Sequence, residues 1–90
     1  MEIIHDKEHN KFYLIRDGME SHIKYSMRDE KTIDFWTTYV PSQQRGKGLA
    51  AELAEAALNY AMQNNLSVIP SCSYIESYID KNEKFKGLVK

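Results

Sequence analysis

The sequence predicts an α/β fold of the α+β kind: an antiparallel meander of about four strands, then a helix, a parallel fifth strand and a short C-terminal helix. Three features lead to this prediction. Two segments that alternate apolar and polar residues flank Asp17-Gly18, a two-residue turn typical of hairpins. Residues 49–64 have the 3.6-residue periodicity of an amphipathic helix. The short apolar run at 66–69 follows, and a strand, a helix and a strand in one sheet imply a parallel, right-handed crossover.

The first half of the chain has the pattern of consecutive hairpin strands. In chain order, the expected segments are a strand over 2–5, a polar loop over 6–10, strands over 12–16 and 22–28, a charged turn over 28–31 and a strand over 32–40. In the third strand Ile23, Tyr25 and Met27 alternate with polar residues, so one face is apolar. The fourth is rich in β-branched and aromatic residues, as expected of a central strand. Pairing should end or bulge at Pro41, because proline cannot donate to the ladder.

The second half of the chain contains the helices. The expected apolar stripe of the helix over 49–64 consists of Leu49, Leu53, Ala56, Ala57, Tyr60 and Ala61. Asn64-Asn65 ends this helix, and a second, shorter helix is expected over 73–82. No repeat, linker or low-complexity tract is evident.

Composition limits the classes of function. Ninety residues predict a single domain over 1–90, too small for a deep internal cavity, so any cofactor is expected in a surface cleft. A net charge of −1 without clustered lysines argues against nucleic-acid binding. The N-terminus lacks signal-peptide features and the apolar runs are too short to span a membrane. A single cysteine allows no internal disulfide, which fits a reducing compartment, so a cytoplasmic location is expected. The protein is also expected to be a monomer or a weak dimer.

The junction between the fourth strand and the long helix is the strongest functional signal. Residues 40–50 read Val-Pro-Ser-Gln-Gln-Arg-Gly-Lys-Gly-Leu-Ala. Gly46 and Gly48 allow positive φ and close approach of a ligand to the backbone. The free N–H groups of the following helix point outward at the positive end of its dipole. Such a site favours an anion, most often a phosphate.

Three interpretations of these glycines compete. Residues 46–51 match a loose dinucleotide fingerprint, but the preceding segments look like hairpin strands and not the start of a βαβ unit. A P-loop is excluded, since Gly-Lys is followed by Gly48 where a Ser or Thr would hold magnesium. What remains is Gln43-x-x-Gly46-x-Gly48, although a glycine-rich turn without function is also common.

This last pattern resembles the acetyl-CoA pyrophosphate loop of the GNAT superfamily of N-acetyltransferases, Gln/Arg-x-x-Gly-x-Gly/Ala, between a strand and a long helix. The predicted strand order is the core of the GNAT fold, in which the fourth and fifth strands splay apart to admit the pantetheine arm. Residues 69–74, Ile-Pro-Ser-Cys-Ser-Tyr, and the tail over 84–89 are similar to small stand-alone GNAT-like acetyltransferases. The resemblance covers nearly the whole chain and implies a minimal GNAT-like fold. One departure is Thr37-Thr38-Tyr39-Val40, where many of these proteins have a His-Thr-Glu-Val type segment.

The resemblance also implies an acetyl-CoA site. The backbone of Tyr39 and Val40 corresponds to the strand end that pairs with pantetheine. The loop residues expected to hold the diphosphate end are Gln43, Gln44, Arg45, Gly46, Lys47, Gly48, Leu49 and Ala50. Arg45 and Lys47 add positive charge there, although loop lysines are often solvated.

Cys72 has two interpretations. It is either a small inert core residue at the end of an apolar strand or, as the resemblance implies, a catalytic thiol beside the acyl thioester. The adjacent helix N-terminus would favour its thiolate. Tyr74 is expected to pack, with proton donation as an alternative. His5 and His9 have no cysteine or carboxylate at metal-ligand spacing, so no metal site is expected, and His22 is expected to be solvated.

Three classes of function follow. The first is an acetyl-CoA-dependent N-acetyltransferase that acts on an amine acceptor of unknown identity, a small molecule or a protein. The second is an acyl-CoA-binding module with little turnover, which the missing His-Thr-Glu-Val segment favours. The third is a structural or interaction domain whose glycines only make a tight turn. Titration with CoA distinguishes the third class from the other two. Release of CoA thiol in the presence of amines distinguishes the transferase from the binding module.

Overall fold

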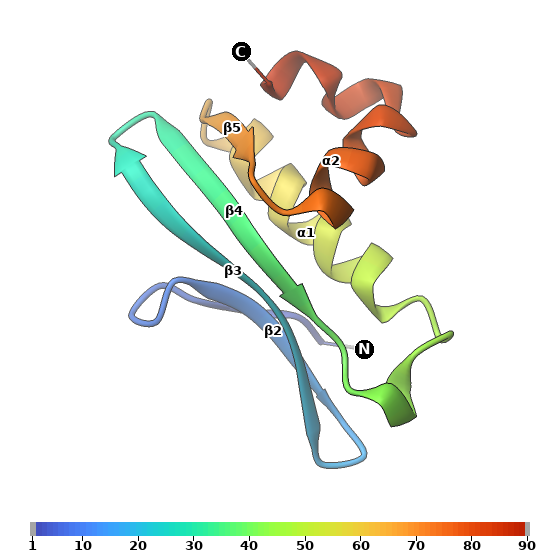
Figure 1. Ribbon diagram of the computed structural model, residues 1–90. Coiled ribbons are helices and arrows are strands. Elements are labelled where there is room, and N and C mark those ends of the chain that lie inside the picture. Colours follow the sequence, from blue (N-terminus) through green and yellow to red (C-terminus); the bar gives the residue numbers. More distant parts are fainter. Residues whose placement is uncertain (1, 90) are drawn as a thin grey trace.

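The computed structural model describes residues 2–89 as one five-stranded sheet with α1 packed across β2, β3 and β4 and with α2 beside β4 and β5 (Figure 1). The elements are β1 Ile4–Asp6, β2 Lys11–Arg16, β3 Met19–Asp29, β4 Thr32–Tyr39, the 3₁₀ turn η1 Ser42–Gln44, α1 Leu49–Gln63, β5 Ser67–Pro70, α2 Ser73–Asp80 and the 3₁₀ segment η2 Glu83–Leu88. The strand order is β1-β2-β3-β4-β5. The first four strands are antiparallel and β5 runs parallel to β4. The predicted meander, helix and parallel fifth strand are confirmed.

The apolar faces predicted from alternation form the core between the sheet and α1. Leu14 on β2, Ile23 on β3 and Phe35 on β4 are fully buried, and α1 packs across these three strands. Leu53 on α1 is likewise buried. Because the period of a strand is two residues, the other sheet face carries the alternate positions, among them the half-exposed Tyr39, which pairs with His22. A register shift between Lys24 and Tyr25 leaves the half-exposed Trp36 of β4 without a partner on β3.

Several element boundaries differ from the prediction. The first strand is Ile4–Asp6 instead of 2–5, because its pairing with β2 is set by Asp6 opposite Lys11. The third strand begins at Met19, which pairs with Arg16 immediately across the two-residue turn. The alternation rule does not detect the residues next to such a tight turn, because their side chains are of mixed character.

The buried stripe of α1 is rotated relative to the predicted one. Ala54 and Leu58 are fully buried, whereas Ala56 and Tyr60 are only half-buried. The cause is a second layer, because α2 and η2 both contact α1. Phe85 of η2 is completely buried in the same core. The sequence did not predict η2, whose six residues are too few to show a helical period.

The sheet opens where β5 leaves it. The pairing of β5 with β4 ends at Phe35 opposite Pro70, and the Cys72 N–H donates to the Phe35 carbonyl at 2.9 Å. The fourth strand continues to Tyr39, paired on its other side with β3. In the described part of the chain, residues 36–39 therefore have no strand partner on the β5 side. This splay is the structural basis of the candidate site.

Candidate functional site

A groove of about 340 Å³ lies at this splay, between the end of β4 and the start of α1. Its lining residues are Thr38, Tyr39, Val40, Gln44, Arg45, Gly46, Gly48, Leu49, Ala50, Ala51 and Tyr74. Most of the residues predicted to bind acetyl-CoA are in this set. Gln43 and Lys47 are exposed on the same loop but do not line the groove.

The glycine loop forms one wall of the groove with a backbone that suits an anion. Gly46 and Gly48 have φ of 80° and 78°, the left-handed region that favours glycine. Apart from the glycine itself and its two chain neighbours, no described residue has a heavy atom within 4 Å of the place where a Cβ on Gly46 or Gly48 would be. Space in front of the backbone is therefore open at both positions, so a ligand could approach the main chain directly.

Helix α1 begins where this loop ends. Gly48 is the N-cap residue, and no side chain caps the helix there. The first intrahelical bond that reaches Gly48 comes from the Glu52 N–H, at 3.1 Å. The N–H groups of residues 49–51 therefore lack an intrahelical acceptor, and they carry the positive end of the helix dipole. This is the arrangement that holds phosphate groups in proteins.

Arg45 reinforces the bend of the loop. Its Nε donates to the Val40 carbonyl at 3.0 Å, although the side chain is otherwise exposed. The Val40 carbonyl was predicted to pair with pantetheine. One of its lone pairs thus already accepts a hydrogen bond from within the protein. Since a guanidinium has five N–H donors, most of the donors of Arg45 stay available for an anion at the loop.

The side chain of Gln44 points away from the solvent. The residue is 2% exposed, and its Nε2 donates to Asp17 Oδ2 at 3.0 Å. The side chain of Gln44 is therefore committed to a contact within the protein, and the prediction that Gln44 binds the cofactor depends on its backbone.

Cys72 lies next to the groove and reaches it through Thr38. Its sulfur is 3.3 Å from Thr38 Oγ1, and Thr38 lines the groove while Cys72 does not. The thiol is half-buried and stands at the N-cap of α2. The structure thus brings Cys72 near the splay of the two strands, one side chain behind the groove surface.

Three groove residues were not in the predicted set. Ala51 follows directly from the helix boundary, since it carries the third free N–H of α1. Thr38 and Tyr74 come from the two sides of the splay, and no sequence pattern distinguishes them from packing residues. Burial raises the pKa of the Tyr74 hydroxyl, which keeps the phenol protonated.

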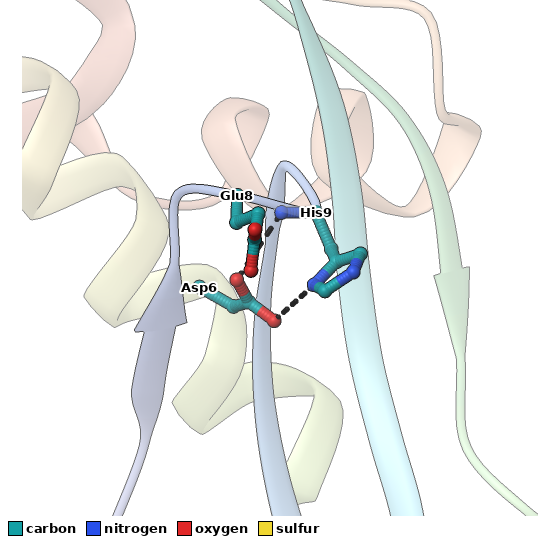
Figure 2. Close-up of side chains that lie close together, drawn as sticks. All are labelled: Asp6, Glu8 and His9. Atoms are coloured by element: carbon teal, nitrogen blue, oxygen red, sulfur yellow. Dashed lines mark hydrogen bonds and ion pairs between the residues drawn. The ribbon is translucent and has the colours of Figure 1, made fainter.

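The surroundings of two histidines, His9 and His22, differ from the prediction. Asp6, Glu8 and His9 form a cluster on the β1–β2 loop, with one ligand-type atom from each within 4.8 Å of the others (Figure 2). The expectation that no carboxylate stands near His9 was therefore wrong. Asp6 accepts a hydrogen bond from the His9 N–H and lies 2.8 Å from His9 Nδ1. These bonds account for the cluster as a loop-stabilising turn.

His22 is also less solvated than expected. Its side chain is 17% exposed, and its Nδ1 lies 2.8 Å from the Glu20 carboxylate. Its ring packs beside the ring of Tyr39, with centroids 5.5 Å apart. The half-burial arises because His22 pairs directly with Tyr39 across the two strands.

Comparison with known proteins decides the family. Residues 11–88 match the GCN5-related N-acetyl-transferase family. The chain belongs to this family. The match extends over strands β2 to β5, the groove and both α-helices, so the GCN5-related N-acetyltransferase fold expected from the loop resemblance is confirmed.

Individual family relatives agree. The chain is 31% identical over 80 residues to protein NATD1 of Xenopus tropicalis, a match that covers 87% of this chain and 73% of the relative. It is 30% identical over 80 residues to protein NATD1 of Homo sapiens, covering 87% and 71%. The NMR solution structure of a GCN5-like protein from Staphylococcus aureus superposes with a TM-score of 0.77 at 28% identity, covering 99% of this chain and 87% of that one.

Within residues 2–89, no helix of this family member combines the length and the hydropathy needed to cross a bilayer.

Proposed function

We propose that this protein is an acetyl-CoA-dependent N-acetyltransferase that transfers an acetyl group to an amine acceptor. The observation that carries the proposal is the splay of the sheet. Residues 36–39 of β4 have a free edge beside the β5 end, and the groove at that edge runs to the glycine loop and the uncapped start of α1. One extended ligand with an anionic centre would match both parts.

The residues present fit acetyl-CoA. The open positions at Gly46 and Gly48 admit a diphosphate next to the backbone, where the first N–H groups of α1 would donate to its oxygens. Arg45 would add a charge-assisted contact. The main chain of Tyr39 and Val40 would pair with the amide groups of the pantetheine arm. Gln43 and Lys47, exposed beside the loop, would contribute charge and polarity around the phosphates.

The chemical step requires orientation and proton movement at the acyl end. Acetyl-CoA supplies an activated acyl thioester. The free edge of β4 would hold an extended arm in one direction, which removes much of the entropic cost of the reaction. Cys72 is the proposed catalytic thiol, and the Thr38 hydroxyl fixes its position. A protonated Tyr74 at the groove wall could donate a proton to a departing thiolate.

One observation favours a second function, an acyl-CoA-binding module with little turnover. Among the described residues that line the groove there is no carboxylate and no imidazole. An acceptor amine must lose a proton during transfer, and these are the usual general bases. The segment 37–40 likewise lacks the His and Glu that the resemblance would supply.

An NMR titration with CoA tests the site independently of turnover. The amides of residues 43–50 should shift first, because they face the anionic end of the ligand. Gly48→Asp and Gly48→Asn form a matched pair, since both side chains tolerate left-handed backbone and differ mainly in charge. The Asp variant should bind CoA at least about tenfold more weakly than the Asn variant, or about 1.4 kcal/mol. Equal affinities in two folded variants would remove the diphosphate from this loop.

Release of CoA thiol from acetyl-CoA in the presence of a panel of amines then separates the two functions. Amine-dependent release supports the transferase. Tight CoA binding with no release above the hydrolytic background for any amine supports the binding module.

We also propose that residues 1–90 act as one domain in a reducing, cytoplasmic environment, in line with the single free cysteine.

A further inference from the structure

The β2–β3 turn touches the glycine loop through one partly buried contact, between the buried side chain of Gln44 and the exposed residue Asp17. Gln44 Nε2 donates to Asp17 Oδ2 at 3.0 Å, across 27 positions of sequence. Every other hydrogen bond of residues 41–47 within the described chain stays inside that segment or reaches its neighbour Val40. The contact between Asp17 and Gln44 is therefore the hydrogen bond that ties the loop to a distant element.

The turn is built to present this carboxylate. Asp17 and Gly18 both have positive φ, at 52° and 73°, as in two-residue hairpin turns. Arg16 and Met19 pair immediately outside it. Asp17 is thus held in a left-handed conformation at the end of two long paired strands, and its position relative to the sheet is fixed.

The side chain of Gln44 lies at a buried position, where burial of an apolar side chain would cost less free energy. It is 2% exposed, and its Oε1 is buried without a hydrogen-bond partner among the described residues. Burial of an amide is unfavourable unless it is bonded, so the bond to Asp17 is what compensates for the polar residue here. That bond involves an ionised acceptor, which makes it stronger than a neutral one. The bond also sets the orientation of the amide, because the opposite one would place two oxygens together.

We propose that Asp17 and Gln44 form a clamp that holds the anion loop in its binding conformation, and that Asp17 is a positioning residue for the ligand. The loop needs such a constraint, because Gly46 and Gly48 have the widest conformational freedom of any residue type. Ordering them on binding would reduce affinity. With Gln44 anchored next to them, this ordering is complete before a ligand arrives. The inference rests on the proposed function of the loop, but the clamp itself is a property of the unliganded protein.

Variants of the two residues can remove the bond without disrupting the turn. Asp17→Gly removes the acceptor and keeps a residue that favours positive φ. Asp17→Asn keeps an acceptor oxygen and also tolerates this conformation. Gln44→Leu fills the same space without the amide. Asn10→Gly is the matched control, because Asn10 has φ of 53° in the β1–β2 turn and lies outside the groove lining.

Two readouts are measured on each variant: the dissociation constant for CoA, and the amide hydrogen exchange, without ligand, of Gln44 and Arg45, whose N–H groups donate to the Pro41 and Ser42 carbonyls within the loop. Asp17→Gly and Gln44→Leu should each weaken CoA binding about three- to tenfold and accelerate exchange, and the double variant should add little to either. Asp17→Asn should stay within about twofold of the parent, and Asn10→Gly should change neither readout.

The two readouts separate the clamp from the proposed function. If the parent protein does not bind CoA but the variants accelerate exchange in the loop, the clamp stands and the proposed ligand is wrong. If the parent binds CoA and the variants lose only thermal stability, with affinity unchanged, the contact is merely structural and the inference is overturned. Additive losses in the double variant would also overturn it, since two members of one bond cannot act independently.

Discussion

At the scale of single residues, Cys72 illustrates how far a side chain's role depends on its neighbours. Its position at the end of an apolar strand fits an inert core residue as well as a catalytic thiol. The structure adds one contact, between the sulfur and Thr38 Oγ1 at 3.3 Å. Because Thr38 lines the groove, a ligand that fills the groove would cover the path to the thiol.

The first prediction follows from this placement. CoA should slow alkylation of Cys72 by iodoacetamide, because access to the thiol controls the rate. Cys72→Ala should lose most acetyl transfer and keep its CoA affinity within about twofold, since the anionic anchor lies on the loop. Alkylation rates with and without CoA, together with calorimetry on the variant, check both parts. Alkylation that ignores CoA, combined with full activity in Cys72→Ala, would assign the residue to the core.

Residue chemistry could be predicted from the sequence only where backbone geometry demanded it. Gly46 and Gly48 were predicted because few other residues adopt positive φ. Gln44 was predicted as a ligand contact, but nothing local indicates that its amide would be buried against Asp17. Thr38 and Tyr74 were not assigned to the groove, because their placement depends on where two strands that are distant in sequence separate, and no local pattern shows this.

At the scale of elements, the short edge strand β1 is attached through its pairing with β2 and through the side chain of His5. Its ring stacks on Phe12 with centroids 4.0 Å apart, and its Nε2 lies 2.6 Å from the Tyr25 hydroxyl. Burial lowers the pKa of His5, and the positive charge of Lys7 lowers this pKa further. The strand of three residues thus depends on a neutral ring held between aromatic groups.

The second prediction is a pH dependence of stability. Because the pKa of His5 is lower in the folded protein than its unfolded value of about 6.5, the unfolded chain binds more protons between the two values. The free energy of unfolding should therefore fall as the pH drops through 6.5 towards the folded pKa, and level off below it. Urea unfolding between pH 5 and 7.5 measures this.

His5→Phe is the comparison for that experiment, since it keeps a ring over Phe12 and removes the titration. Its profile should be flatter over the same range, whatever its absolute stability. Parallel profiles for the two proteins would show that His5 does not couple to folding.

Element order was predictable because hydrophobic period and turn chemistry agree along most of the chain. The hairpin at Asp17-Gly18, the helix and the crossover strand each have a strong local signal. The exceptions are η2, which is too short for a period to appear, and the rotated stripe of α1; the first strand was predicted, with bounds that differ from those of β1. The last depends on the cover that α2 and η2 provide, and such tertiary contacts are not visible in a local pattern.

At the scale of the whole molecule, the groove joins elements that are separated in the sequence, from β4 to α2. Thr38 comes from the meander, Leu49 from the start of α1 and Tyr74 from α2. A ligand in the groove would contact the folded arrangement and not the unfolded chain, in which these groups are far apart. Binding should therefore raise global stability by mass action.

The third prediction uses this linkage. CoA at about 100 times its dissociation constant should stabilise the protein by about 2.7 kcal/mol, which for a domain of this size raises Tm by roughly 10–20 °C. Desulfo-CoA at the same concentration should give a similar shift, because the anion loop and the β4 edge do not contact the sulfur in the proposed arrangement and its dissociation constant should therefore be similar. Adenosine 3′,5′-bisphosphate lacks the pantetheine arm and the diphosphate link, so it should bind more weakly and shift Tm less at equal concentration. A shift with acetyl-CoA but with neither analogue would mean that recognition depends on the acyl end alone, in contradiction to a site built on the glycine loop.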